Sequence, residues 1–348
     1  MKKKIIFFLL LGILLFSGCT NNNQNKILKK IKSNIDKHEK YEVKANLELI
    51  SNDESYNYSV VLDNYKDKYY KVSLINKANS KEQVILKNED AVYVITPSLN
   101  KSFKFQSSWP NNSSQIYLLE SVYNDIKTDE KRTFDVTKNG YIFTSEVSFP
   151  SNIALKKQKV TVDNDYYIRK VEILNKNDVA MMTIVFERPK GKNLNTDDFS
   201  LDNFIEKEEE TKEKEDKEST TEEKEDKESK EETVSALDDI LYPLYLPPNT
   251  KLSNKQTVNT ENGQRAILTF AGDKSFILVE ENSIKEDEFT VVPTSGEPCL
   301  FMDAIGSLSD NSITWTSNDV DYYLTSTVMN QKELMEVAQS INITPNTK

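Results

Sequence analysis

The chain has 348 residues and an acidic balance, with 56 Asp and Glu against 45 Lys and Arg and a formal net charge of −11. This balance argues against a nucleic-acid partner, which requires clustered positive charge. Two cysteines and one histidine, His38, are too few for the usual catalytic triads or for zinc sites built on several His and Cys ligands. The composition therefore predicts a protein that is not an enzyme and that holds no metal or cofactor.

The first 26 residues have the pattern of an export signal followed by a short tether. Three lysines precede an apolar run over 5–16, which is too short to span a bilayer as a helix and suits the core of a signal peptide. A Ser-Gly pair stands directly before Cys19, as in bacterial lipoprotein signals. We expect residues 1–18 to be cleaved and Cys19 to carry acyl chains such as palmitate. Residues 19–26 would then tether the protein to the outer face of the cytoplasmic membrane.

A first module is expected over 27–205, and it opens with an amphipathic helix. Ile27, Leu28, Ile31 and Ile35 have the spacing of one helix face. Alternating apolar and polar segments follow, separated by tight polar breaks that are typical of hairpin turns. These segments predict strands over 43–50, 56–62, 69–74, 83–86, 91–95 and 102–105.

A second helix is predicted over 113–126, halfway through this module. Ser113 or Ser114 is the expected N-cap. Ile116, Leu119, Tyr123 and Ile126 would form its buried stripe. Five more strands are predicted, over 133–136, 141–147, 157–162, 167–174 and 181–186. A single antiparallel sheet of about eleven strands must curl strongly or close.

An acidic segment over 206–233 separates this module from a second one over 234–348. Glu-Lys-Glu-Asp-Lys-Glu-Ser occurs there twice, and 206–232 hold 15 acids and 7 bases. Such a segment lacks the apolar side chains that a core needs, so we expect a low-complexity, disordered linker.

The second module is predicted to be small and of the α+β class. Its expected strands lie over 265–270, 275–280, 289–292, 299–302, 313–315 and 322–326, with a turn at 296–298 and a final helix over 331–341. Trp315, Tyr322 and Tyr323 are expected in its core. The order of strands, turn and terminal helix resembles a small α+β domain that follows acidic linkers in other exported bacterial proteins.

Several strings of the first module resemble the germination lipoprotein GerS of spore-forming bacteria and its relatives. They are Phe103-Lys104-Phe105 leading to Trp109-Pro110, Ser114-Gln115-Ile116-Tyr117-Leu118-Leu119, and the strand pair over 158–163 and 166–174. The resemblance covers 27–205 and implies a strongly curled antiparallel half-barrel of the LolA and RseB type. It further implies a lipoprotein near the forespore membranes that binds and activates a spore-cortex peptidoglycan amidase. The zinc and the catalysis would belong to that partner.

The sequence leaves two alternative functions open, and it leaves two possible roles open for the string around Trp109-Pro110. The curled sheet could instead carry lipid or lipoprotein acyl chains, as in LolA, or report envelope state to a membrane-bound regulator, as in RseB. Trp109, Pro110 and Tyr117 are candidates for a partner interface, because proline restricts the aromatic residue before it to extended conformations. The same residues would equally serve as a plug on the open side of the curl.

Overall fold

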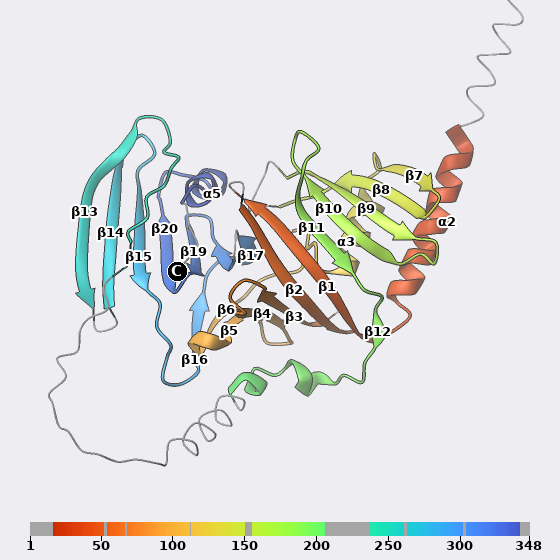
Figure 1. The fold of residues 1–348 in the computed structure, drawn as a ribbon, viewed down its shortest axis with the longest axis horizontal. Coiled ribbons are helices and arrows are strands. Elements are labelled where there is room, and N and C mark those ends of the chain that lie inside the picture. The colour runs from red at the N-terminus through yellow and green to blue at the C-terminus, as the bar shows by residue number, and fades with distance from the viewer. Residues whose placement is uncertain are drawn as a thin grey trace, which may run out of the picture.

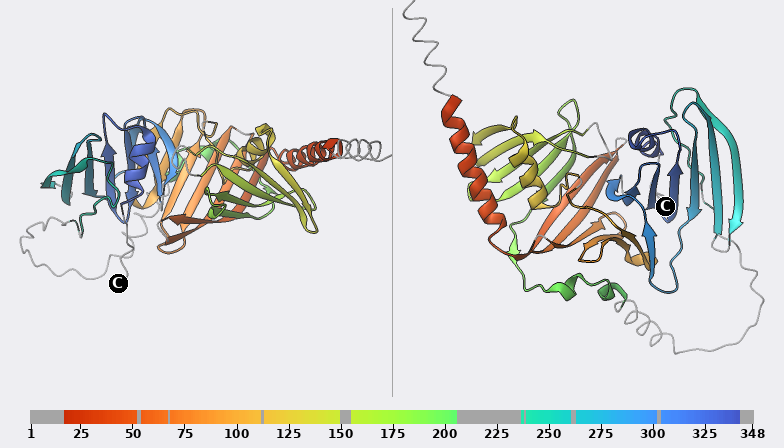
Figure 2. Two further views of the ribbon diagram at one scale, coloured as in Figure 1. Left: turned by 90° about the horizontal axis from the view of Figure 1, so that it is seen from above. Right: turned by 180° about the vertical axis from the view of Figure 1, so that it is seen from behind.

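The computed structural model describes residues 17–51, 54–66, 68–111, 113–149, 155–205, 237, 239–260, 263–301 and 304–341. It is an α+β fold built on two β-sheets, of 13 and 7 strands, with helices α2 (Ser17–Ile35), α3 (Leu119–Thr128) and α5 (Gln331–Ala338). The two sheets lie next to each other, and α2 stands at the end of the molecule far from the smaller sheet (Figures 1 and 2).

The first and last long strands of the larger sheet meet in its middle. β1 pairs with β2 on one side and with β11 on the other, both antiparallel. From there the strands run outward to β6 on one side and to β7 on the other. Their bounds are β1 Lys40–Ser51, β2 Glu54–Tyr65, β3 Tyr69–Asn76, β4 Glu82–Lys87, β5 Val92–Thr96, β6 Lys101–Phe105, β7 Thr133–Thr137, β8 Gly140–Glu146, β9 Lys157–Asp163, β10 Ile168–Leu174 and β11 Ala180–Phe186. These eleven antiparallel strands confirm the predicted half-barrel.

The helices complete the apolar core on one face of the curl. α3 joins the far strands β6 and β7 in the chain, and it contacts both α2 and β8. Ile31 of α2 and Ile126 of α3 are fully buried in the same cluster as Leu47 and Val171 of the sheet. Apolar residues at every second position of β1, such as Val43, Ala45 and Leu47, lie in this cluster, so side chains of the sheet fill the curl from this face.

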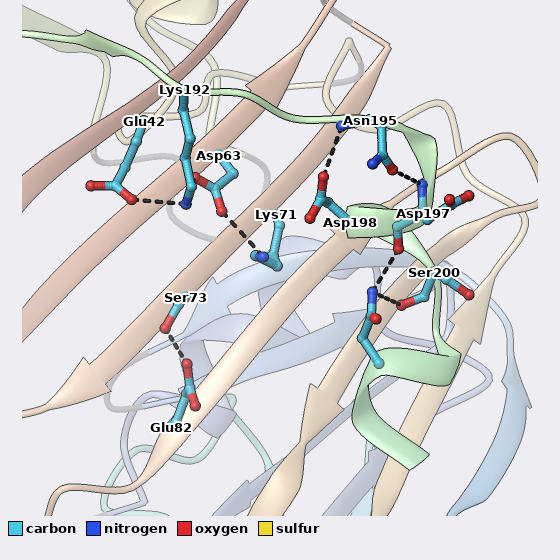
Figure 3. A network of polar contacts seen from close by, with 11 residues as sticks. Glu42, Asp63, Lys71, Ser73, Glu82, Lys192, Asn195, Asp197, Asp198 and Ser200 are labelled. Carbon is cyan, nitrogen blue, oxygen red and sulfur yellow. Dashed lines mark hydrogen bonds and ion pairs between the residues drawn. The ribbon is translucent and has the colours of Figure 1, made fainter. Parts of the chain in front are cut away.

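The opposite face of the sheet is covered by the chain segment that follows β11. This segment forms the short β12 (Lys190–Gly191), which pairs with β1, and the 3₁₀ helix η2 (Thr196–Phe199). Its residues Leu194 and Phe199 pack on Tyr69 and Tyr93 of the sheet. Asn195 and Asp198 form a capping box at the start of η2 (Figure 3).

A buried carboxylate fastens this covering segment. Asp63 of β2 is 2% exposed and lies 3.1 Å from the Lys71 ammonium and 2.8 Å from that of Lys192 (Figure 3). Lys192 also reaches Glu42 at 2.9 Å, so the buried charge has two cationic partners. The desolvation cost of Asp63 is thus compensated, and we assign this network a structural role.

The smaller sheet has the strand order β13-β14-β15-β20-β19-β18-β17. Helix α5 packs on β19 and β20 and begins with a capping box between Asn330 and Glu333. Its buried side chains meet Trp315 and Tyr322, whose rings stack 4.8 Å apart. The bounds are β13 Thr250–Thr260, β14 Gly263–Gly272, β15 Phe276–Asn282, β17 Glu297–Phe301, β18 Ala304–Leu308, β19 Ser312–Ser317 and β20 Val320–Thr325.

One predicted helix begins later than expected. α3 starts at Leu119, because the backbone before it makes other hydrogen bonds. The Ser114 N–H donates to the Ser148 carbonyl at 2.9 Å, and the Gln115 N–H donates to Ser121 Oγ at 2.8 Å. Ile116 is buried, but it lies before the helix.

Four predictions for the smaller sheet were also wrong. β13 was missed because its residues are almost all polar and exposed, which removes the alternating pattern. β18 was missed as well, and Glu297, placed in a turn, begins β17. Tyr323 is 42% exposed, whereas Trp315 and Tyr322 lie in the core as expected.

Candidate binding cleft between the two sheets

A strand from the C-terminal half joins the larger sheet. β16 (Thr290–Thr294) lies in the chain between β15 and β17 of the smaller sheet, yet it pairs in parallel with β6 over five residue pairs. The Asn100 side chain donates to the Glu286 carbonyl at 2.7 Å just before this strand. The sequence left open whether the modules touch, and the structure shows that they share a sheet.

Further contacts fasten the smaller sheet across the mouth of the curl. Ile305 of β18 is 4% exposed and belongs to the core cluster of the larger sheet. Its N–H donates to the Gln83 side chain at 2.7 Å. Ion pairs join Lys101 to Asp321 at 3.2 Å and Lys81 to Asp319. The mouth of the half-barrel is therefore covered by the C-terminal half of the same chain.

A cleft of about 430 Å³ lies within this junction. Its volume falls in the range of small-molecule sites, about 300–1,000 Å³. Phe103, Phe105 and Val94 line it from the larger sheet, and Val279 and Tyr323 line it from the smaller one. Charged and polar groups at its wall are Lys101, Glu281, Asp321, Thr314 and Thr316.

An apolar row leads out of this cleft over the face of the smaller sheet that lies opposite α5. Ile267 of β14 is the cross-strand partner of Val279 in β15, which in turn is the partner of Tyr323 in β20. Cross-strand partners point to the same side of a sheet, so these three side chains form one continuous strip. Ile277, 38% exposed, lies on the same face beside it. We call these four residues the apolar strip.

Charged residues flank the apolar strip on one side. Arg265 forms a bidentate ion pair with Glu281, with its closest contact at 2.7 Å. Asp321 also accepts from Ser283 Oγ at 3.1 Å and from Thr316, so its carboxylate is held in place. An apolar center with a polar edge is the usual anatomy of a protein-binding surface.

The ion pair between Lys101 and Asp321 is expected to contribute modestly to the joint. The two side chains are 18% and 31% exposed, so solvent screens the pair only in part. A double-mutant cycle with Lys101→Met and Asp321→Asn should give a coupling of about 1 kcal/mol in the free energy of unfolding. The cycle Lys157→Met and Asp178→Asn, on a more exposed pair 2.6 Å apart, is the control and should give less. Equal couplings would contradict this assignment.

Two of the three candidate interface residues, Trp109 and Tyr117, lie inside the molecule, and Pro110 is half-buried. Trp109 is completely buried, and its ring makes an edge contact with Tyr70 at 5.8 Å between centroids. Tyr117 is 2% exposed, and its hydroxyl donates to the Gln115 side chain at 2.8 Å. Burial of the hydroxyl raises the pKa of Tyr117. This placement is what the plug interpretation requires, and the interface interpretation stays a prediction that needs the loop around Pro110 to open.

The part of the chain that the structure describes gives no sign of a metal site. Among the described residues, no group of three or more His, Cys, Asp or Glu could hold a metal ion. Cys299 lies in β17, and burial raises the pKa of its thiol to about 12. No helix in the described part of the chain has the length and apolar character to cross a membrane.

The membrane anchor and the linker are not tested by the structure. Residues 1–16 of the predicted signal lie outside the described residues, as does 206–236 with the predicted linker. Cys19 belongs to helix α2, where only its backbone is described. Lipidation at Cys19 and the module boundaries stay predictions.

Sequence reasoning missed the apolar strip. A signal for it was present in the alternation of Ile267, Ile277, Val279 and Tyr323 with the buried residues beside them. Both faces of β14, β15 and β20 carry apolar side chains, but only one of these faces meets α5. An apolar residue on the second face of a strand predicts a second covering layer or a binding surface.

A curled antiparallel sheet with an unclosed side, covered at its mouth by a second sheet, defines the chain as an unclosed-barrel protein of two modules. No protein-family model matches it. The chain is 32% identical over 333 residues to sporulation protein YdcC of Bacillus subtilis (strain 168). The aligned region covers 95% of this chain and 94% of that protein. It belongs to the family of this sporulation protein.

Solved structures give more distant likenesses. The MucA/MucB complex of Pseudomonas aeruginosa matches at 11% identity and a TM-score of 0.30, over 91% of this chain and 97% of the matched chain. The CwlD amidase of Clostridioides difficile in complex with the GerS lipoprotein matches at 20% identity and a TM-score of 0.28, over 49% of this chain and 94% of the matched one. A LolA superfamily protein from Nitrosomonas europaea matches at 14% identity and a TM-score of 0.29, over 51% and 98%. Likenesses at this level carry no argument about function.

Proposed function

We propose that the chain is a lipid-anchored, non-catalytic sporulation factor that binds a protein partner outside the cytoplasmic membrane. Membership in the family of a sporulation protein carries this proposal. The GerS-like strings around Trp109 and Tyr117 extend it to the partner, a spore-cortex peptidoglycan amidase that the chain activates. The chain supplies a binding surface and a membrane position, and the partner supplies the catalysis.

The filled interior of the curl supports a protein binder over an acyl-chain carrier. A carrier needs an empty apolar cavity that takes up a chain. Here α3, Trp109 and Ile305 all lie in the core cluster on the concave face. The cleft at the mouth has several charged and polar groups in its wall, including Lys101 and Asp321, which an acyl chain would leave without solvation.

The apolar strip is the surface that we assign to the partner. Tyr323 is exposed and lies at the junction of the strip with the cleft, where an aromatic side chain gives a large contact area. Single exposed apolar residues are common on proteins, but cross-strand neighbors that form a row are not. The charged residues beside the row would orient the partner.

A pull-down of the full-length protein in detergent micelles with the organism's cortex amidase tests this function. We expect a complex and a gain of amidase activity. Tyr323→Ala should weaken the complex about tenfold or more, which is the range of an aromatic interface anchor. Tyr245→Ala is the matched control, since Tyr245 is 43% exposed against 42% for Tyr323 and lies outside the strip.

Two results would contradict the proposal. Absence of a complex when both proteins are folded would exclude the amidase as partner. A deletion strain with normal cortex and altered sigma-factor output would favor the envelope sensor.

Lipidation is tested separately with Cys19→Ala. We expect the variant to leave the membrane fraction and to lose incorporation of labeled palmitate, because the acyl chains supply the membrane affinity. Cys299→Ala is the control and should keep both. Retention of Cys19→Ala in the membrane fraction would contradict the predicted anchor.

A further inference from the structure

A second cleft, of about 420 Å³, lies beside helix α3 and is separate from the one between the sheets. It is formed by the first turns of α3, the loop after Trp109 and the end of the segment after β8. We call it the serine–asparagine cleft. Serine, asparagine and acidic side chains make up most of its lining, together with Tyr70, Pro110 and Leu118.

The lining is made of small neutral hydrogen-bonding groups. Hydroxyls come from four serines and Tyr70, and amides come from Asn111 and Asn124. Among the described residues that line this cleft, none is Lys or Arg, so it offers no cation to a phosphate or a carboxylate. Apolar side chains are few, which disfavors an acyl chain. The ligand that matches this set is neutral and carries many hydroxyl or amide groups.

The cleft is held in a fixed shape by its own hydrogen bonds. The Ser148 N–H donates to Ser114 Oγ at 3.0 Å, while the Ser114 N–H donates to the Ser148 carbonyl at 2.9 Å. The Gln115 N–H donates to Ser121 Oγ at 2.8 Å. Behind the wall, buried Trp109 supports Tyr70. Preorganized groups lose little entropy when a ligand binds.

Two carboxylates add acceptors without making the cleft strongly anionic. Glu120 forms an ion pair with Lys32 of α2 at 2.8 Å, which neutralizes its charge. Burial raises the pKa of Asp125 to about 6, although its hydrogen bond with Ser114 lowers it. Carboxylates accept hydrogen bonds from hydroxyl groups, and each acceptor can take more than one.

We propose that the serine–asparagine cleft binds a neutral saccharide. The exposed side chains of Asn111, Asn124 and Ser148 and the two carboxylates bond the sugar hydroxyls. Pro110, which is half-buried, contacts the apolar face of the ring. Pro110, Ser114 and Leu118 of the GerS-like strings lie in the lining of this cleft. The inference does not depend on the amidase partner.

The test is a titration of the full-length protein in detergent with an N-acetylglucosamine tetrasaccharide, a glucose tetrasaccharide and a neutral tetrapeptide, followed by calorimetry or NMR. We expect millimolar or tighter binding of at least one saccharide. Asn124→Ala should weaken that binding by about threefold to tenfold, the effect of one lost hydrogen bond. Asn124→Trp should abolish it by filling the cleft. Lys127→Ala, on the same helix and outside the lining, is the control.

The outcomes separate the ligand classes. Tighter binding of the N-acetylglucosamine tetrasaccharide than of the glucose one would show that the acetamido groups of the ligand form hydrogen bonds with the cleft. Binding of the tetrapeptide alone, binding of no probe at millimolar concentration, or equal binding by Asn124→Trp would each overturn the proposal. Asn124 is exposed, so its variants are expected to fold.

Discussion

Trp109→Ala is expected to lower the free energy of unfolding by about 3–5 kcal/mol, the usual range for removing a buried tryptophan. The ring is completely buried between the sheet and the loop that leads to α3. Its neighbors, Tyr70 and Tyr117, are held by hydrogen bonds and a ring contact and cannot collapse freely into the cavity. When the surrounding side chains cannot fill the cavity, the variant loses the full stabilisation that the contacts of the indole ring provided.

The two tryptophans make this measurement informative. The chain has only Trp109 and Trp315, and each lies in the core of a different sheet. In Trp109→Ala the fluorescence comes from Trp315 alone, while circular dichroism follows both sheets. Because β16 and Ile305 join the modules, we expect the two signals to change at the same denaturant concentration.

Asn111→Ala, an exposed change in the same loop, is the control and should alter stability by less than about 0.5 kcal/mol. Trp109→Phe should recover part of the loss. A normal stability of Trp109→Ala together with a lost amidase complex would contradict the plug and support the interface interpretation. Separate transitions of the two sheets would contradict the rigid joint.

Glu280→Gln is expected to raise the free energy of unfolding by about 1–3 kcal/mol at about pH 8, and by much less at about pH 4. Glu280 of β15 is fully buried in the smaller module. One carboxylate oxygen accepts from the Leu241 N–H at 3.0 Å, and the other has no partner among the described residues. Burial raises the pKa of Glu280 to about 7 from 4.5, although the Leu241 hydrogen bond and the nearby Lys255 charge lower it.

The sign of the pH dependence follows from this shift. Below about pH 4.5 the carboxyl is protonated in both the folded and the unfolded state, so it costs nothing. Between pH 4.5 and about 7 the unfolded state releases the proton while the folded state retains it, so stability falls as pH rises. Above about pH 7 the folded protein holds an ionized buried group, and the glutamine variant avoids that cost.

Urea unfolding at several pH values, followed by circular dichroism, measures this effect. Glu281→Gln is the matched control, because it changes the adjacent residue on the opposite face and removes the ion pair with Arg265. This control should lower stability slightly and should not reproduce the gain at alkaline pH. A Glu280→Gln variant that is less stable than the parent at alkaline pH would contradict the assignment of a buried, costly carboxylate.

Much of the fold was predictable because local patterns agree with the final structure. Most strands from β1 to β11 alternate apolar and polar residues, β4 and β5 contain short continuous apolar runs, and polar turns separate them all. Both the spacing of apolar residues and the turn residues therefore indicated these strands. α3 was placed correctly from its stripe of Leu119, Tyr123 and Ile126, but its start was wrong. Ser114, one of the two serines expected to cap it, bonds instead to Ser148, a contact that only the folded chain brings together.

The candidate sites were less predictable. Trp109 was singled out correctly as an unusual residue, yet its burial depends on Tyr70 and on the strands beneath the loop. β13 has no apolar alternation and forms because β14 offers it a hydrogen-bonding edge. The apolar strip requires knowledge of which residues lie opposite each other on β14, β15 and β20, and cross-strand register is set by the whole sheet.

The sequence by itself determined the signal pattern before Cys19, the acidic segment, the curled antiparallel class and the scarcity of histidine and cysteine, because each depends on local composition or on the period of apolar residues. Only the tertiary structure decided that β16 joins the first sheet, that Ile305 enters its core and that two clefts form. The pairing of β16 and the contacts of Ile305 join residues about 200 positions apart. They are stabilised by apolar burial and by backbone hydrogen bonds between strands. Neither interaction depends on a particular local sequence, because any exposed strand edge can pair with another strand and any apolar surface can be buried. Local patterns therefore do not show which partners meet.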